Sequence, residues 1–266
     1  MTDPKNRIHE LKERLDALRP LAPGLLASLR ESYDIELTYT SNAIEGNTLT
    51  LRETAEVIQH GITVGGKRLA EHLEATDHYD ALRWMREHAE SDTPLDEATV
   101  RELHRRVVLH SKPDIAGQYS QFPRRIAGSA VILPNAAKVP HLMKQLGEHL
   151  RDVPNTPESA FDAHFRLVEI HPFADGNGRT ARLLMNLILI RGGYPPVAVR
   201  PEDRERYLDT LEHASLKKDR EPFQAFMHER LEATMKDYVA LFDEAIDAQR
   251  QQRALAEHQR SQGCGY

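Results

Sequence analysis

A histidine, an aspartate, an asparagine, two glycines and two arginines follow one another closely in IHPFADGNGRTARLLMNLILI, residues 170–190. Apolar residues precede and follow them at helical spacing, so we expect two buried helices joined by a polar loop. The first helix should end at His171, because Pro172 disfavours helical backbone at the residue before it. The second should begin near Asn177, with its unpaired N–H groups facing the loop.

This loop has the residue types of a phosphate-binding site. Unpaired N–H groups and the positive end of a helix dipole attract anions, and Gly176 and Gly178 permit close approaches that side chains would prevent. Arg179 and Arg182 are three residues apart on the first turn, so both can reach phosphate oxygens. Two cations at a helix N-terminus are unfavourable unless an anion binds there. The presence of both arginines therefore favours a phosphate-binding site.

His171 and Asp175 add a base and a metal ligand to the same loop. An imidazole titrates near neutral pH and can accept a proton from an attacking hydroxyl. A carboxylate is the kind of ligand that Mg²⁺ takes when phosphate and water complete its shell. In an isolated turn such a cluster would indicate only loop hydrogen bonding, but the glycines and arginines favour phosphate chemistry.

The elements that must position this loop are mostly helices, and the sequence predicts a mainly α fold. Segment 124–140 is the exception, because a β-leaning run at 131–133 between Gly128 and Pro134 predicts a short hairpin. The composition of residues 247–266 predicts a charged helix that frays into a disordered end. The expected helices lie near residues 5–18, 22–45, 50–61, 68–89, 95–110, 140–152, 157–170, 177–192, 202–216 and 220–249.

Composition narrows the class of protein. The 266 residues are 40% hydrophobic, which is enough for a buried core in one larger domain or two small ones. A net charge of −6 argues against nucleic acid as the main partner. Because no run of 18 apolar residues and no signal-peptide core occur, we expect no membrane span and a cytoplasmic location. The one cysteine, Cys264, excludes an internal disulfide and reads as an incidental tail thiol.

Two other patterns suggest sites but are better explained by structure. GITVGGK, residues 61–67, has the spacing of a P-loop, but Arg68 stands where a serine or threonine should hold magnesium, and a helix precedes it. We interpret Gly61 as the end of that helix. His164 has no third ligand at a zinc-like spacing, so we expect it to pack between helices or to support the site.

HPFADGNGRTAR, residues 171–182, resembles the signature of the Fic family, His-x-Phe-x-(Asp/Glu)-Gly-Asn-Gly-Arg-x-x-Arg, at every defined position. Four other segments resemble Fic sequences in the expected order: GQYS, the hairpin segment, VPHLM and RPEDRERYLDTLEHA. The resemblance therefore spans roughly residues 30–230. It implies a Fic-type helical bundle with the hairpin at 126–133 as a flap over the active site. The implied regions are an N-terminal helical region with an inhibitory helix (1–95), the Fic core (96–230), and a C-terminal helix with a flexible tail (231–266).

The resemblance implies transfer of AMP from ATP to a serine, threonine or tyrosine hydroxyl of a target protein, with autoadenylylation. The flap would align the target segment by strand addition. Ser120 stands where many relatives have arginine, which leaves the anchoring of the flap open. The implied roles are His171 as base, Asp175 as Mg²⁺ ligand, Asn177 with the backbone of Gly176 and Gly178 as the cradle of the α- and β-phosphates, Arg179 at the β-phosphate and Arg182 at the γ-phosphate.

A second stretch, SNAIEG, starts at Ser41 and resembles the inhibitory motif of the class II members, whose inhibitory helix precedes the core. Ser41 and Glu45 share one helix face and Gly46 can end the helix, although an ordinary helix end gives the same pattern. The resemblance implies that Glu45 pairs with Arg182 and withholds it from ATP. Removal of AMP by the same glutamate stays an open alternative.

Other functions fit the same residues. A Fic enzyme with another phosphate-containing donor keeps the site, although Arg179 and Arg182 favour a triphosphate. A nucleotide-sensing binding module on the Fic fold is a different class, and the intact His171 argues against it. The sequence identifies neither the target protein nor the signal that relieves inhibition, and it leaves a homo-oligomer open.

Overall fold

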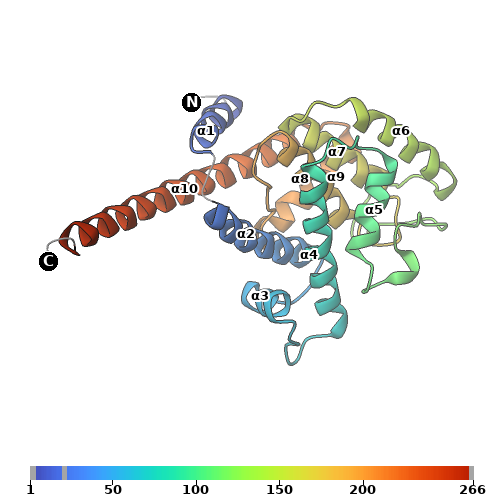
Figure 1. Ribbon diagram of the computed structural model, residues 1–266. Coiled ribbons are helices and arrows are strands. Elements are labelled where there is room, and N and C mark those ends of the chain that lie inside the picture. The colour runs from blue at the N-terminus through green and yellow to red at the C-terminus, as the bar shows by residue number, and fades with distance from the viewer. Residues whose placement is uncertain (1–3, 20–22, 264–266) are drawn as a thin grey trace.

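A computed structural model describes residues 4–19 and 23–263 and has the mainly α architecture expected (Figure 1). Three short 3₁₀ helices join the α-helices: η1 (Pro113–Ile115), η2 (Ala136–Lys138) and η3 (Pro201–Asp203). The α-helices are α1 (Pro4–Ala17), α2 (Pro23–Ile44), α3 (Leu51–His60), α4 (Leu69–Ala89), α5 (Glu97–Val107), α6 (Val139–Asp152), α7 (Pro157–Ile170), α8 (Asn177–Arg191), α9 (Arg204–Lys217) and α10 (Glu221–Gly263).

Local sequence signals explain where several helices begin. Thr50 and Glu53 form a reciprocal capping box at the start of α3, and Asp96 caps α5. Thr156 accepts a hydrogen bond from the N–H of Ser159, and Pro157 occupies the first turn of α7. Because these caps lie within two or three residues of the expected boundaries, the predicted helices are confirmed.

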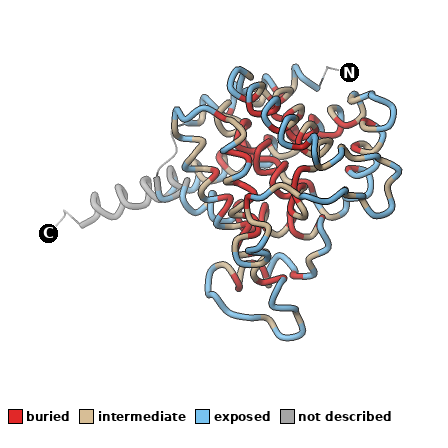
Figure 2. Tube along the Cα trace, turned by 90° about the vertical axis from the view of Figure 1, so that its right-hand side faces the viewer, coloured by how far each residue is buried: buried red, intermediate tan, exposed pale blue. Residues whose placement is uncertain are grey.

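Helix α8 lies at the centre of the molecule and packs against α7, α4 and α5. Nearly all of its side chains are buried, and Figure 2 shows the buried residues gathered in the middle of the fold. One hydrophobic cluster includes Ile8 of α1, Leu187 of α8 and Met235 of α10. The expected N-terminal, core and C-terminal regions therefore contribute to a common core.

Helix α1 packs along α10, which runs well beyond the body of the fold (Figure 1). The composition predicted a helix that ends near residue 249 and then frays, but α10 continues to Gly263. Glutamine, alanine and arginine are strong helix formers, so their propensity extends the helix through a segment with few apolar residues. Cys264 lies outside the described residues.

The β-hairpin expected over 126–133 is not seen in the structure. No strand is assigned between residues 120 and 139, and the segment makes a turn in which Gly128 has a φ of +77°. Its polar groups bond elsewhere, because Ser129 Oγ and the N–H of Ala130 both donate to the Glu212 carboxylate of α9. Residues 126–133 are therefore held by contacts to α9 and not by a hydrogen-bonded ladder.

The P-loop-like stretch is an ordinary helix end, as expected. Gly61 caps α3 in the left-handed conformation, with a φ of +64°. Lys67 donates to the carbonyl oxygen of Thr48 and lies near Glu53, so its ammonium supports the turn. Among the described residues, no helix combines the length and the apolar character needed to cross a membrane.

Candidate active site

The loop between α7 and α8 is fixed by its own backbone and by one side chain. His171 ends α7 in the left-handed conformation, with a φ of 50°, and its N–H donates to the Leu167 carbonyl. Asn177 Oδ1 accepts from the N–H of Phe173 at 2.9 Å, and Asn177 Nδ2 donates to the Phe173 carbonyl at 2.9 Å. The amide of Asn177 therefore holds the loop in shape, while the backbone at the start of α8 faces the site.

The anion site predicted at the start of α8 is covered by a carboxylate. A Cβ added to Gly178 would overlap Oε1 of Glu45, so the Glu45 carboxylate lies directly against the first turn of the helix. Unpaired N–H groups and the helix dipole stabilise a negative charge there. The side chain from the expected inhibitory motif thus occupies the position suited to a phosphate.

Arg182 joins Glu45 and Ser41 into one network. Its Nη2 donates to Glu45 Oε1 at 2.7 Å and to the Ser41 carbonyl at 2.9 Å, and its Nε donates to Ser41 Oγ at 3.0 Å. Burial alone would lower the pKa of Arg182, but the Glu45 charge and Tyr207 raise it. The guanidinium is charged and fully occupied by α2 and the turn that follows it.

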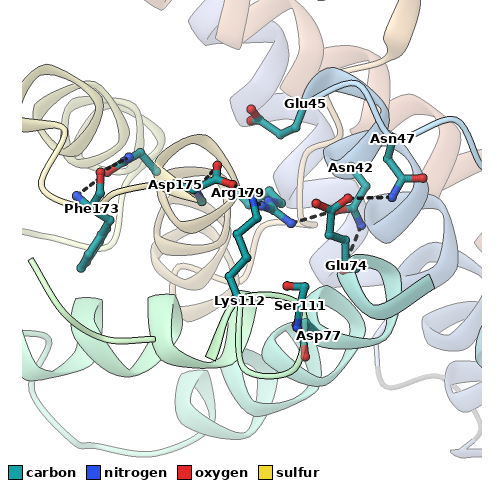
Figure 3. Close-up of polar contacts among 12 residues, drawn as sticks. Asn42, Glu45, Asn47, Glu74, Asp77, Ser111, Lys112, Phe173, Asp175 and Arg179 are labelled. Carbon is teal, nitrogen blue, oxygen red and sulfur yellow. Dashed lines mark hydrogen bonds and ion pairs between the residues drawn. The ribbon is translucent and has the colours of Figure 1, made fainter. Parts of the chain in front are cut away.

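Arg179 is also held by α2, through a residue that sequence reasoning did not select. Its Nη1 donates to Asn42 Oδ1 at 3.4 Å, and Asn42 Nδ2 donates to the Thr38 carbonyl at 3.0 Å (Figure 3). Asn42 lies inside SNAIEG, next to Ser41, but the motif leaves its position undefined. The contact appears only when α2 and α8 are packed together.

The C-terminal end of α2 is tied to two other elements. Arg204 Nε donates to the Ile44 carbonyl at 2.8 Å, which satisfies one of the free carbonyls of the helix end. Asn47 Nδ2 donates to the Glu71 carbonyl of α4 at 3.0 Å. Gly46 has a φ of +94°, which suits glycine, and turns the chain between these anchors. Glu45 is therefore presented from a fixed turn.

The imidazole of His171 is partly buried beside this network. Burial lowers its pKa from the ordinary value of 6.5, while the Val168 backbone and the Glu45 charge act in the opposite direction. A neutral imidazole at physiological pH has one nitrogen free to accept a proton. His171 thus meets the chemical requirement for a base, as its sequence position suggested.

Asp175 is surrounded by cations at the same loop. Lys112 forms an ion pair with its carboxylate, and Arg179 Nη2 lies 3.9 Å from Oδ2. Burial raises the pKa of Asp175, but Lys112 and Arg179 outweigh burial and keep it below its ordinary value. An ionised, half-exposed carboxylate beside an anion site fits Mg²⁺ shared with phosphate oxygens. No group of three or more acidic, histidine or cysteine side chains in the described part of the chain could hold a metal alone.

His104 supports the loop from α5. Its Nδ1 accepts from the N–H of Gly117 at 3.0 Å, so its Nε2 carries the proton and donates to the Asp175 carbonyl at 3.0 Å. Its ring stacks on Phe173 with centroids 3.6 Å apart, and burial lowers its pKa to about 4. A lone histidine about 70 residues before the motif gave no signal for this role.

Residues 120–133 contain the expected flap and are called the flap segment. Backbone contacts anchor its start despite the serine at position 120. The N–H of Ser120 donates to the Pro172 carbonyl at 2.8 Å, and Tyr119 pairs with Phe173 in an isolated antiparallel bridge. Arg124 Nε donates to Ser120 Oγ at 2.9 Å, so an arginine reaches this place from four residues further on. The flap segment is thereby attached to the loop that carries His171.

His164 has the supporting position expected of it. It is fully buried in α7, and its Nε2 lies 2.8 Å from Tyr207 Oη. Its ring stacks on Phe223 with centroids 5.3 Å apart. Tyr207 also raises the pKa of Arg182, so His164 connects to the site through that tyrosine.

Known proteins resemble this chain in sequence and in structure. A sequence model of the Fic/DOC family matches residues 94–189. Protein adenylyltransferase Fic of Nematostella vectensis is 35% identical over 243 residues, which cover 88% of this chain and 55% of that protein. Protein adenylyltransferase fic-1 of Caenorhabditis elegans is 33% identical over 250 residues, with coverages of 90% and 47%. The chain thus spans about half the length of the curated relatives it matches.

Solved structures share the fold. A Fic domain containing signaling protein from Bacteroides thetaiotaomicron has a TM-score of 0.81 at 28% identity, covering 90% of this chain and 97% of that chain. A fragment of Fic-1 from Caenorhabditis elegans has a TM-score of 0.76 at 32% identity, with coverages of 91% and 73%. Both similarities cover far more of the chain than the family match at residues 94–189 does.

Proposed function

Because this chain belongs to the Fic/DOC family, we propose that it is an autoinhibited protein adenylyltransferase that moves AMP from ATP to a hydroxyl of a protein, itself included. The observation that carries the proposal is the carboxylate of Glu45 on the first turn of α8, paired with Arg182. A carboxylate held at the start of a helix indicates that the site binds anions, and it blocks the phosphates of a nucleotide from the same position.

His171 starts the reaction by accepting the proton of the target hydroxyl. The oxygen attacks the α-phosphorus of ATP, a new P–O bond forms, and the bond from that phosphorus to the bridging oxygen breaks. Pyrophosphate leaves with the electron pair of the broken bond, and AMP remains on the target. This chemistry needs positioning and charge stabilisation rather than a covalent enzyme intermediate.

The phosphates are held by the start of α8. Its first N–H groups and the backbone of Gly176 and Gly178 cradle the α- and β-phosphates, while Asn177 keeps the loop rigid through Phe173. Arg179 lies at the β-phosphate and Arg182 at the γ-phosphate, each through a planar guanidinium. The second contact requires Arg182 to exchange Glu45 for phosphate.

Asp175 would hold Mg²⁺ together with phosphate oxygens and water, since its carboxylate is ionised and lies beside the start of α8. When bound, the ion neutralises charge on the phosphates and favours departure of pyrophosphate. His104 fixes the backbone of Asp175 through its carbonyl, so the carboxylate starts from a defined position.

The target protein binds along the flap segment. Phe122 and Ile132 are 72% and 94% exposed, so each can bury an apolar side chain against a partner. An extended target segment would add backbone hydrogen bonds along the same residues. The attachment of the flap to Phe173 and Pro172 would hold the target hydroxyl near His171.

Intact-mass analysis tests this function directly. The protein is incubated with Mg²⁺ and ATP labelled at the α-phosphate, and we expect addition of AMP to the chain, with stronger labelling when Glu45 is replaced. ATP labelled at the γ-phosphate serves as the control, because a phosphate-transferring enzyme would retain that label instead. Absence of label from both nucleotides in the Glu45→Gly protein would contradict the proposed function.

The pH dependence of transfer should report on His171. We expect the acidic limb of the rate profile to have its midpoint below pH 6.5, because burial lowers the pKa of this base from its ordinary value. The measurement is the initial rate of AMP transfer by the Glu45→Gly protein against pH, with ATP and Mg²⁺ saturating throughout. An acidic limb with its midpoint above 6.5 would contradict the role or the environment assigned to His171.

A further inference from the structure

The carboxylate of Asp175 already has a cation bound to it. Lys112 rises from the loop after α5 toward Asp175 and Arg179, and its ammonium pairs with Asp175 Oδ2 (Figure 3). Oδ1 accepts a hydrogen bond from the N–H of Gly176 at 2.6 Å. Both oxygens are therefore engaged, and a divalent ion can bind Oδ2 only if a cation moves away from it.

The position of Lys112 is prepared by a buried aspartate. Asp77 of α4 is 1% exposed and accepts hydrogen bonds from the N–H groups of His110 and Ser111 at 2.8–3.0 Å. His110 Nδ1 also lies 2.7 Å from Asp77 Oδ1. The N–H of Lys112 donates to the Val108 carbonyl at 2.9 Å. Its backbone is thus fixed, and only the flexible stem carries the ammonium to Asp175.

Of the two cations near Asp175 Oδ2, Lys112 is the one that can yield. Arg179 is 2% exposed and tied to Asn42, so it cannot move without disturbing α8. The Lys112 side chain is 44% exposed and ends in a compact, strongly hydrated ammonium. Water can replace the carboxylate around that ammonium at little cost.

We propose that Lys112 occupies the cation position of the active site and competes with the divalent metal ion for Asp175, so that it sets the metal concentration the enzyme requires. The proposal rests on the proposed function, because it takes Asp175 as the metal ligand of a nucleotide site. Metal binding moves the ammonium from Asp175 toward the bound phosphates. The site therefore keeps a positive charge at Asp175 whether or not the metal is present.

Binding of Mn²⁺ provides a test that does not depend on turnover. Free Mn²⁺ is measured by electron paramagnetic resonance in the full chain saturated with a non-hydrolysable α,β-methylene analogue of ATP. The Glu45→Gly background removes a second carboxylate that could hold the ion. We expect Lys112→Met to bind Mn²⁺ about three- to tenfold more tightly than its parent, because a half-exposed ion pair and one repulsive charge are lost.

Three further variants separate the explanations. Lys112→Arg keeps a cation and should retain the weak metal binding of the parent. Lys144→Met removes an equivalent charge from the exposed face of α6 and should leave Mn²⁺ affinity unchanged. Asp175→Asn should abolish the tight site in every background.

Equal Mn²⁺ affinity in Lys112→Met and its parent, or weaker affinity in the variant, would overturn the competition while leaving the proposed function intact. Tightening by Lys144→Met to the same extent would also overturn it, because general charge would then explain the effect. If the Glu45→Gly protein binds neither the analogue nor Mn²⁺, the proposed function fails and the role of Lys112 fails with it.

Discussion

His171→Ala should lower the rate of AMP transfer by about 10²–10⁴-fold, the usual cost of losing a general base. The loss should fall on the chemical step, because the hydrogen bonds of Asn177 and the start of α8 that shape the nucleotide site do not involve the imidazole. The rate is measured as labelled AMP incorporated by Glu45→Gly and by the same protein with His171→Ala, at saturating ATP and Mg²⁺.

The backbone at position 171 calls for a second variant. His171 has a φ of 50°, and asparagine adopts this left-handed conformation more readily than alanine. His171→Asn should therefore keep the end of α7 intact and still lose the base. Thermal unfolding and binding of the ATP analogue serve as controls in both variants. A transfer rate equal to that of the parent in either protein would exclude His171 as the base.

Glu45→Gly should raise AMP transfer by roughly tenfold to nearly a thousandfold. That range corresponds to a preference of about 1.4 to 4 kcal/mol for the blocked state over productive ATP binding. In the variant, Arg182 exchanges its ion pair with Glu45 for a contact with the γ-phosphate, so the arginine itself gains little. The increase in the transfer rate therefore measures how strongly Glu45 suppresses productive ATP binding in the parent protein. Glu45 lies in the turn after α2, so glycine removes the carboxylate with little cost to the helix.

Two companion variants identify how the glutamate acts. Glu45→Gln keeps a side chain of the same size but removes the charge from the start of α8, and it should give a smaller gain than glycine. The double change Glu45→Gly with Arg182→Ala should lose most of the gain, because the freed partner is missing. Autoadenylylation of parent, single and double variants is compared under identical Mg²⁺. If the rate for Glu45→Gly is lower or unchanged, residues 41–46 are an ordinary helix end without an inhibitory role.

Most of the fold follows from local sequence signals. The helices around the site begin and end within a few residues of expectation, because caps such as Thr156 and stops such as Pro172 act over one or two turns. The flap segment forms no hairpin in the structure, where the run at 131–133 has no partner strand and Glu212 accepts the hydrogen bonds of Ser129 and Ala130. The length of α10 was underestimated because helix propensity acts where apolar periodicity is weak.

The site was predictable where its residues are adjacent in sequence and unpredictable where packing brings them together. The loop from His171 to Arg182 carries its own turn chemistry, so its geometry could be anticipated. Asn42, His104 and Lys112 reach that loop from α2, α5 and the loop after α5. Nothing in the type or spacing of these three residues distinguishes them from core or surface positions, so only the packed helices reveal their roles.

The anchoring of α2 limits how inhibition can be adjusted. Its inner face is part of the core, where Thr38, Ser41 and Asn42 are buried, and its end is fastened by Arg204. A helix that contributes to folding cannot be detached as a removable plug, since its departure would expose the core. In the proposed function, relief of inhibition would therefore come from reorientation of the Glu45 side chain in its turn. Differences in basal activity between variants of this protein should map to the few residues that touch this carboxylate, whereas substitutions along the buried face of α2 should reduce the amount of folded protein.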